Sequence, residues 1–387
     1  MNKNKLLRAC PVCQNTGGGE VLHTQKFVLP DNHVLPKEYD IVVCGGCGFI
    51  YADTRAGQDA YDKYYSEMSK YDTNYINSDT SLFVDRAVWI SRFIDNKKAS
   101  IIDVGCGNGQ LLLELEKIGF SNLTALDPSS ACIDAIRRRG ICGIVSSIFD
   151  VLPDKKYDNL ILSGVLEHIY DINKIMQTIK LLLKPNGLLF VCVPDASRYL
   201  DYDTVAYDYF NIEHINHFDE TSLISLGFLH GLNMESFIKT DITLPGSKQP
   251  VIFCVYRNGD KTATDWKNYP KVSIVNYIEK TGKKESANRI IDKLVESKEE
   301  VIIWGAGNYA SRLLATSNLA KCNILMFVDN DKHKQGVSIA GRPVCAPENI
   351  SSGGKTATIL VTAAVFHEEI FSEIRSMGIG NKVIILK

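Results

Sequence analysis

The sequence lacks the features that mark nucleic-acid-binding, membrane-spanning and secreted proteins. Its 387 residues include 43 Lys plus Arg and 45 Asp plus Glu, a formal net charge of -2. Without a basic excess or a basic stripe, the charge gives no support for a nucleic-acid partner. No apolar run is long enough to span a bilayer, and the residues before Cys10 contain no apolar segment typical of a secretory signal. We expect a cytoplasmic protein that binds neither nucleic acid nor membranes.

The cysteines divide into four that are paired in sequence and seven that are scattered. The chain has 11 cysteines. The scattered ones, such as Cys106, Cys192 and Cys254, lie in expected strands or turns, and an oxidised secreted chain rarely keeps so many single thiols. This usage favours a reducing, cytoplasmic environment.

The other four cysteines form two Cys-x-x-Cys pairs near the start of the chain. "CPVC" runs from Cys10 to Cys13 and "CGGC" from Cys44 to Cys47, with 30 residues between the pairs. Two such turns direct four sulfurs at one ion, and a site with four protein ligands is structural rather than catalytic. The spacing predicts a structural zinc site. An iron site of the rubredoxin type and a redox dithiol are the alternatives.

The chain is long enough for two or three domains. From Ala99, apolar runs alternate with amphipathic segments, which predicts an α/β fold with a doubly wound, mostly parallel sheet. A second α/β unit begins at "EEVIIWGAGNYASRLLA". We therefore predict a metal-binding module over residues 1–80, a central domain over 81–257 and a C-terminal Rossmann-like α/β domain over 258–387.

A Gly-rich turn opens the central domain. "DVGCGNG", from Asp103 to Gly109, follows an expected strand and precedes an amphipathic helix. Its glycines allow backbone N–H groups to approach a ligand, and Asp127, at the end of the next strand, can bind both hydroxyls of a ribose. The glycines are spaced more tightly than in the dinucleotide fingerprint, although an NAD-type turn is the alternative.

At these residues the chain resembles the class I S-adenosylmethionine-dependent methyltransferases. "DVGCGNG" and "ALDPS" are similar to their first two motifs, and "YDNLILSGVLEHI" and "LKPNGLLFVCVP" resemble their fourth and fifth strands. The resemblance implies a Rossmann-like seven-stranded sheet and S-adenosyl-L-methionine as cofactor. The cofactor-binding residues that it implies are Asp103, Gly105, Gly107, Asp127, Pro128, Ser147, Ile148 and Ser163.

Two segments that follow strands carry candidate proton acceptors. Glu167-His168 follows the fourth strand and Glu213-His214-x-x-His217 the fifth. Histidine suits proton removal near neutral pH, and a glutamate can orient it or act itself. The alternatives are that His217 merely precedes a helix capped by Asp219, that Glu167 and His168 only shape their loop, or that Glu213, His214 and His217 bind a metal.

A Tyr-rich passage precedes the central domain. Its tyrosines can cover a pocket and hydrogen-bond a polyol or keto substrate, or they can be half-buried packing. Tyr65 and Tyr71 are our candidates for contact with substrate.

Over nearly its whole length the chain resembles the sugar C-methyltransferases, which act on nucleotide-linked keto-deoxysugars. The resemblance implies that the zinc module and the C-terminal domain flank the central sheet and enclose a nucleotide sugar. It also implies that Tyr65 or Tyr71, His168 and the Glu213-His214 pair line the reacting carbon. Loss of a proton next to a ketone would give an enolate that attacks the methyl group. We expect a small-molecule partner of this kind and a monomer or homodimer.

The chain departs from this family in one segment. Where the family has a segment with His and Arg near the last strands, the chain has "LPGSKQPVIFCVYRN", without the His and without a matching Arg. An O- or N-methyltransferase for a sugar or glycan is therefore an alternative, as is a non-catalytic adaptor that binds S-adenosylmethionine.

The C-terminal domain has its own Gly-rich turn. Gly305, Gly307 and Asp329 are placed as in a Rossmann unit, but Tyr309-Ala310 occupies the region of the third fingerprint glycine. An NAD site, a contact surface for the nucleotide part of the substrate and a scaffold role are the three interpretations.

Overall fold

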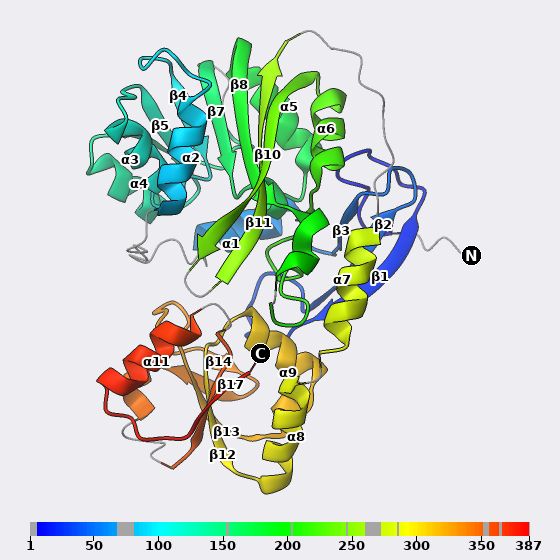
Figure 1. The fold of residues 1–387 in the computed structure, drawn as a ribbon, viewed down its shortest axis with the longest axis vertical. Coiled ribbons are helices and arrows are strands. Elements are labelled where there is room, and N and C mark those ends of the chain that lie inside the picture. Colours follow the sequence, from blue (N-terminus) through cyan, green and yellow to red (C-terminus); the bar gives the residue numbers. More distant parts are fainter. Residues whose placement is uncertain are drawn as a thin grey trace.

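The computed structural model describes residues 6–67, 81–151, 155–202, 204–244, 247–259, 272–284, 286–350, 356–363 and 366–386. These residues form three sheets of four, seven and six strands. In Figure 1 the seven-stranded sheet lies at the top, the six-stranded sheet at the bottom and the N-terminal strands at the right.

The middle sheet has the strand order β10-β11-β8-β7-β4-β5-β6, which confirms the predicted seven-stranded α/β architecture. Five strands are parallel, and β11 and β10 extend the sheet as an antiparallel pair. The strands are β4 (Ile101–Val104), β5 (Leu123–Asp127), β6 (Cys142–Val145), β7 (Tyr157–Ser163), β8 (Leu183–Pro194), β10 (Leu232–Leu244) and β11 (Ser247–Asn258). The order in which strands are added to the sheet reverses between β4 and β7, and open α/β sheets bind their ligands at such a switch point.

Helices cover both faces of this sheet. They are α2 (Ser81–Ser91), α3 (Gln110–Lys117), α4 (Ser130–Arg137), α5 (Ile172–Leu182) and α6 (Glu220–Leu229). Apolar side chains of α2, α3 and α4 pack in one core, and those of α5 and α6 pack in another. Local sequence fixes the helix starts, because Ser129, Asp171 and Asp219 each accept a hydrogen bond from a backbone N–H of the first turn.

The N-terminal sheet has the strand order β1-β2-β3-β9. Its strands are β1 (Gly19–Lys26), β2 (Glu38–Cys44), β3 (Ile50–Asp53) and β9 (Asn216–His217), and helix α1 (Gln58–Glu67) follows β3. Strand β9 comes from the loop between β8 and α6, so the middle part of the chain supplies one edge of this sheet. Helix α7 (Val272–Gly282) lies beside β1 (Figure 1), and its Ile274 and Tyr277 pack in the core of the N-terminal sheet.

The C-terminal sheet has the strand order β14-β15-β13-β12-β16-β17. Its strands are β12 (Glu300–Trp304), β13 (Asn323–Val328), β14 (Ser338–Ile339), β15 (Arg342–Cys345), β16 (Thr358–Val361) and β17 (Val383–Ile385). Its helices are α8 (Ser286–Ser297), α9 (Asn308–Thr316) and α11 (His367–Ser376). Helix α9 meets the N-terminal unit, where Ser311 Oγ donates to the carbonyl of Val28 over 2.7 Å.

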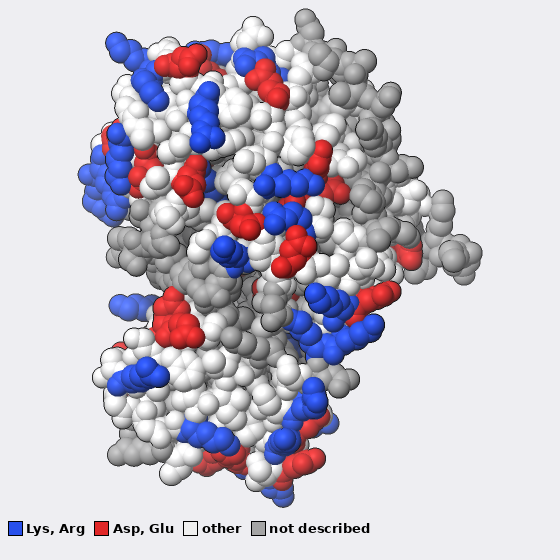
Figure 2. Space-filling model, in the orientation of Figure 1, with Lys and Arg blue, Asp and Glu red and all other residues white. Residues whose placement is uncertain are grey.

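The surface carries charges of both signs. On the face in Figure 2, basic and acidic side chains are interspersed rather than gathered by sign. Among the described helices, none combines the length and the apolar character needed to cross a bilayer.

Candidate functional site

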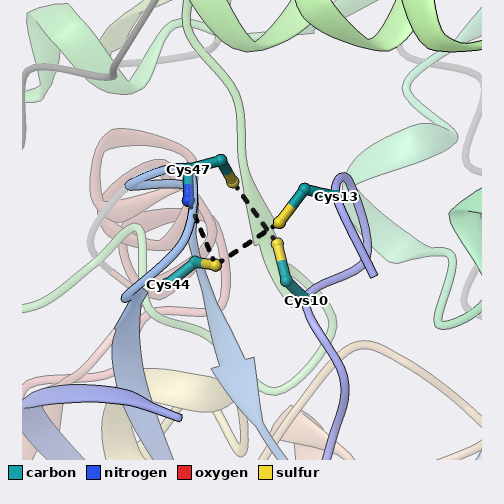
Figure 3. A group of neighbouring side chains, drawn as sticks. All are labelled: Cys10, Cys13, Cys44 and Cys47. Atoms are coloured by element: carbon teal, nitrogen blue, oxygen red, sulfur yellow. Dashed lines mark hydrogen bonds between the residues drawn. The ribbon is translucent and has the colours of Figure 1, made fainter. Parts of the chain in front are cut away.

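The two cysteine turns face each other and bring four sulfurs together (Figure 3). The Sγ atoms of Cys10 and Cys47 are 3.6 Å apart, as are those of Cys13 and Cys44. A tetrahedron with zinc–sulfur bonds of about 2.3 Å has edges of about 3.8 Å. The four sulfurs are thus spaced as the ligands of one tetrahedral zinc ion. The backbone N–H of Gly46 points at Cys44 Sγ from 3.3 Å.

The N-terminal part with the two cysteine turns and strands β1 to β3, here called the cysteine unit, packs directly on the middle domain. Cys10, Cys44 and Cys47 are buried, and they share one hydrophobic core with Phe218 and with residues of α5, α6 and the sheet. An ion held there would stabilise the turns that lie against the loops of the middle sheet.

The Gly-rich turn lies at the carboxyl edge of the middle sheet. Gly105 and Gly107 have φ of 68° and 53°, in the left-handed region that favours glycine. A Cβ on Gly105 would lie 2.8 Å from Val165 Cγ2. The Asp127 carboxylate is fixed beside the turn, since it accepts hydrogen bonds from the N–H groups of Gly107 and Ser129, both at 2.9 Å. A carboxylate held beside a Gly turn fits the ribose and backbone contacts of an adenosine cofactor.

The other predicted cofactor residues follow the same row of strand ends. Pro128 follows β5, Ser147 and Ile148 follow β6, and Ser163 ends β7. Asp103 is buried in β4, and burial raises the pKa of its carboxyl to about 8, against the opposing charge of Arg86. Arg86 Nη1 also donates to Ser163 Oγ over 2.8 Å. The structure thus gathers the predicted residues along one edge.

Four of the predicted catalytic residues meet beside this edge. Tyr65, on α1, forms a hydrogen bond of 2.8 Å with His168 Nδ1, and the same nitrogen lies 3.2 Å from the carbonyl oxygen of Glu213. The rings of His168 and His214 meet edge to face with centroids 4.7 Å apart. Tyr71 lies outside the described residues.

Glu167 lies beside His168 and is the further member of this cluster. Its side chain is buried, its Oε1 lies 3.9 Å from His168 Nε2, and its Oε2 has no hydrogen-bond partner among the described residues. Burial raises the pKa of this carboxyl to about 8. Ligand atoms of Glu167, His168 and His214 lie within 4.8 Å of one another, so these three residues can hold a metal ion.

His217 has a different environment from the two histidines of the cluster. It lies in β9 opposite Ile50, is 3% exposed and meets the Tyr199 hydroxyl at 3.3 Å through Nδ1. Burial lowers the pKa of its imidazole to about 3. These contacts favour the interpretation in which His217 is structural and precedes a helix capped by Asp219.

Sequence reasoning missed several residues of the site. Tyr64 donates to Glu213 Oε1 over 2.9 Å, and Asn211 Oδ1 accepts from the N–H groups of Glu213 and His214 at 2.9 and 2.8 Å. Arg86 is a buried cation in the mostly apolar helix "SLFVDRAVWIS", where it follows Asp85. Apart from their residue types, nothing in the sequence marked Tyr64 or Asn211 as part of the site.

Comparisons with known proteins agree with this geometry. Residues 81–236 match the family model described as a methyltransferase domain, and residues 297–385 match one described as C2185-like, N-terminal. The match and the seven-stranded sheet identify the central unit as a class I S-adenosylmethionine-dependent methyltransferase domain.

Similar curated proteins include ubiquinone biosynthesis O-methyltransferases. That of Rickettsia felis is 31% identical over 107 residues, which are 26% of this chain and 43% of that protein. That of Bradyrhizobium diazoefficiens is 28% identical over 97 residues, 24% of this chain and 38% of that protein. The chain thus spans less than half the length of these relatives.

Among solved structures, similarity extends to the 1,6-didemethyltoxoflavin-N1-methyltransferase of Burkholderia thailandensis. It is 14% identical, with a TM-score of 0.42, and covers 56% of this chain and 98% of that one.

Proposed function

We propose that the protein is an S-adenosylmethionine-dependent methyltransferase that C-methylates a nucleotide-linked keto-deoxysugar through an enolate. The observation that carries the proposal is the cluster of His168, Glu213 and His214 with Tyr64 and Tyr65, next to the Gly-rich turn. Two imidazoles, a carboxylate and two phenols can exchange protons with a substrate and also orient its polar groups.

The cofactor would be held by the turn and by its neighbouring strand. Gly105 and Gly107 would contact its methionine end, and Asp127 its ribose hydroxyls. When bound, S-adenosylmethionine supplies a methyl group activated by a positively charged sulfur. The protein therefore mainly contributes alignment and a base. Cys10, Cys13, Cys44 and Cys47 would hold a structural zinc ion that leaves no position open for substrate.

We assign proton removal to His214 and oxygen stabilisation to the Tyr65–His168 pair. The C–H bond next to the ketone breaks, its electron pair forms the enolate, and the proton moves to the His214 imidazole. A hydrogen bond from the pair stabilises the negative oxygen. With the cofactor bound, the enolate carbon would take the methyl group and the sulfur would keep the electron pair of the broken carbon–sulfur bond. Asn211 orients the Glu213-His214 backbone throughout.

The test is exchange of solvent protons without the cofactor. With a 4-keto nucleotide sugar, the wild type should exchange the proton next to the ketone, and His214→Asn should slow this exchange by about 100-fold or more, the usual contribution of a general base. NMR in deuterated water measures the rate. His230→Asn is the control, because His230 is the C-cap of α6, where its carbonyl accepts from Lys180 Nζ. Absence of both exchange and methyl transfer in the wild type would contradict the proposal.

An O- or N-methyltransferase for a sugar or glycan is the second candidate. The curated relatives named above are O-methyltransferases by name, and His214 can deprotonate a hydroxyl as well as a carbon acid. An O-methyl or N-methyl signal in the NMR spectrum of the product would decide for it. For a non-catalytic adaptor, His214→Asn would leave every measured property unchanged.

A further inference from the structure

Arg8 lies two residues before the first cysteine, and its guanidinium contacts three separate segments. The residue is 3% exposed. Nη1 is 3.4 Å from the carbonyls of both Ala52 and Ile215. Nη2 donates to the carbonyl of Ile169 over 3.3 Å, to the carbonyl of Tyr170, and to Asn216 Oδ1 over 3.1 Å.

Four of these five acceptors belong to the two loops that carry the candidate catalytic histidines. Ile169 and Tyr170 directly follow His168, and Ile215 and Asn216 directly follow His214. The fifth, Ala52, lies in β3. The Arg8 side chain thus bridges the loop that follows His168, the loop that follows His214 and strand β3.

The guanidinium is held firmly in place. The N–H groups of Leu7 and Arg8 donate to the Asp53 carboxylate over 3.0 and 2.7 Å, which fixes the backbone of Arg8 to β3. The cation also lies 4.4 Å from the ring centroid of Tyr170 and 5.6 Å from that of Tyr51.

The two loops are joined to each other at the same place. The Ile215 N–H donates to the carbonyl of Glu167 over 2.8 Å, and Asn216 Nδ2 donates to the carbonyls of Leu166 and Ile169 over 2.8 and 2.7 Å. Because Arg8 binds the Asn216 oxygen, it also fixes which way this amide points. Loss of the guanidinium would leave several buried carbonyls with fewer donors, which favours a different loop arrangement.

We propose that Arg8 is a positioning residue that sets the relative placement of His168 and His214, and so couples the cysteine unit to the methyl-transfer site. The catalytic meaning of this placement rests on the proposed function. The planar guanidinium matters, because a lysine ammonium carries its three donors on a single nitrogen and cannot replace the two nitrogens that contact three segments.

Hydrogen–deuterium exchange on the full chain tests this role without turnover. In Arg8→Met, the amides of His168 and Ile215, which donate to the carbonyls of Val165 and Glu167, should exchange about tenfold faster or more. Arg8→Lys should accelerate the same amides and is the milder variant if Arg8→Met fails to fold. S-adenosylhomocysteine affinity and metal content per chain should stay within about twofold of wild type, because Arg8 contacts neither the Gly-rich turn nor the sulfurs.

Arg312→Met is the matched control, since Arg312 is 4% exposed but lies on α9 in the C-terminal domain. It should leave the His168 and Ile215 amides unchanged. Unchanged exchange of these amides in both Arg8 variants would overturn the proposal, and so would an equal rise over the whole chain.

A kinetic measurement separates this proposal from the proposed function. With an accepted substrate, Arg8→Met should lower kcat at least about tenfold while KM for S-adenosylmethionine stays unchanged. A wild type without turnover contradicts the proposed function and leaves the exchange result as the test of Arg8. A variant whose KM rises while kcat is unchanged contradicts the positioning role.

Discussion

His217 and His214 are three residues apart, but their surroundings assign them different roles. His217 is enclosed by Tyr199, Phe210 and β3, and it stays neutral because burial lowers its pKa to about 3. The unfolded chain binds a proton on this imidazole below about pH 6.5, whereas the folded protein does not. Its contribution to stability is therefore complete above that pH and declines as the pH falls towards 3.

The resulting prediction is a pH-dependent difference between wild type and His217→Phe. Between about pH 6 and pH 4, the wild type should lose unfolding free energy about 1.4 kcal/mol per pH unit more steeply than the variant. Urea denaturation over this range measures both slopes. Parallel slopes would show that His217 is protonated in the folded state.

The family resemblance and the placement of residues after strands nominated much of the candidate site, but not the residues that support it. His168, Glu213, His214 and Tyr65 were expected to meet, and they do. Arg8 and Asn211 act mainly through hydrogen bonds to backbone atoms, and a backbone partner cannot be recognised from its residue type. Their roles follow only from the folded chain.

At the scale of elements, two strand–turn–helix units show the same hydrogen-bond pattern. Asp127 accepts from the N–H of Gly107 at 2.9 Å, and Asp329 accepts from the N–H of Ala306 at 2.8 Å. Only the first unit lies next to the histidine cluster.

We expect Asp127→Asn to weaken S-adenosylhomocysteine binding by about tenfold or more, through loss of a charge-assisted hydrogen bond to the ribose. Asp329→Asn should leave it unchanged. Calorimetry measures both, and equal losses would contradict the assignment of the site to the first turn.

The central strands β4, β5 and β7 were predictable because they are largely buried and apolar and are followed by glycine or by a helix cap. Strand β9 could not be predicted, since two residues carry no periodicity and its partner β3 lies far away in the sequence. Long-range pairing of this kind depends on tertiary contacts rather than on local propensity.

At the scale of the whole molecule, the cysteine unit and the methyltransferase domain share one core. Loss of the proposed zinc ion should therefore also affect the loops of the methyltransferase domain. We expect Cys44→Ser to lower both metal content and Tm and to accelerate amide exchange in residues 211–217. Binding of S-adenosylhomocysteine should stay within a few-fold of wild type, because the site proposed for it is built from the ends of β4 to β7.

Cys142→Ser is the control for this experiment, because Cys142 is an exposed single cysteine on β6. It should change neither metal content nor Tm. A Cys44→Ser protein with unchanged exchange in residues 211–217 would show that the cysteine unit folds independently of the site loop.

Strand β9 also determines how this protein can be recombined with others. The N-terminal sheet is closed by Asn216 and His217, so it is not encoded by one continuous stretch of the gene. A chimaera that exchanges only residues before the central domain would pair a foreign β3 with the resident β9, and a foreign Arg8 equivalent with resident loops. Transplanting the unit together with residues 169–170 and 211–217 keeps these pairings intact, and for the same reason these segments are expected to covary among related proteins.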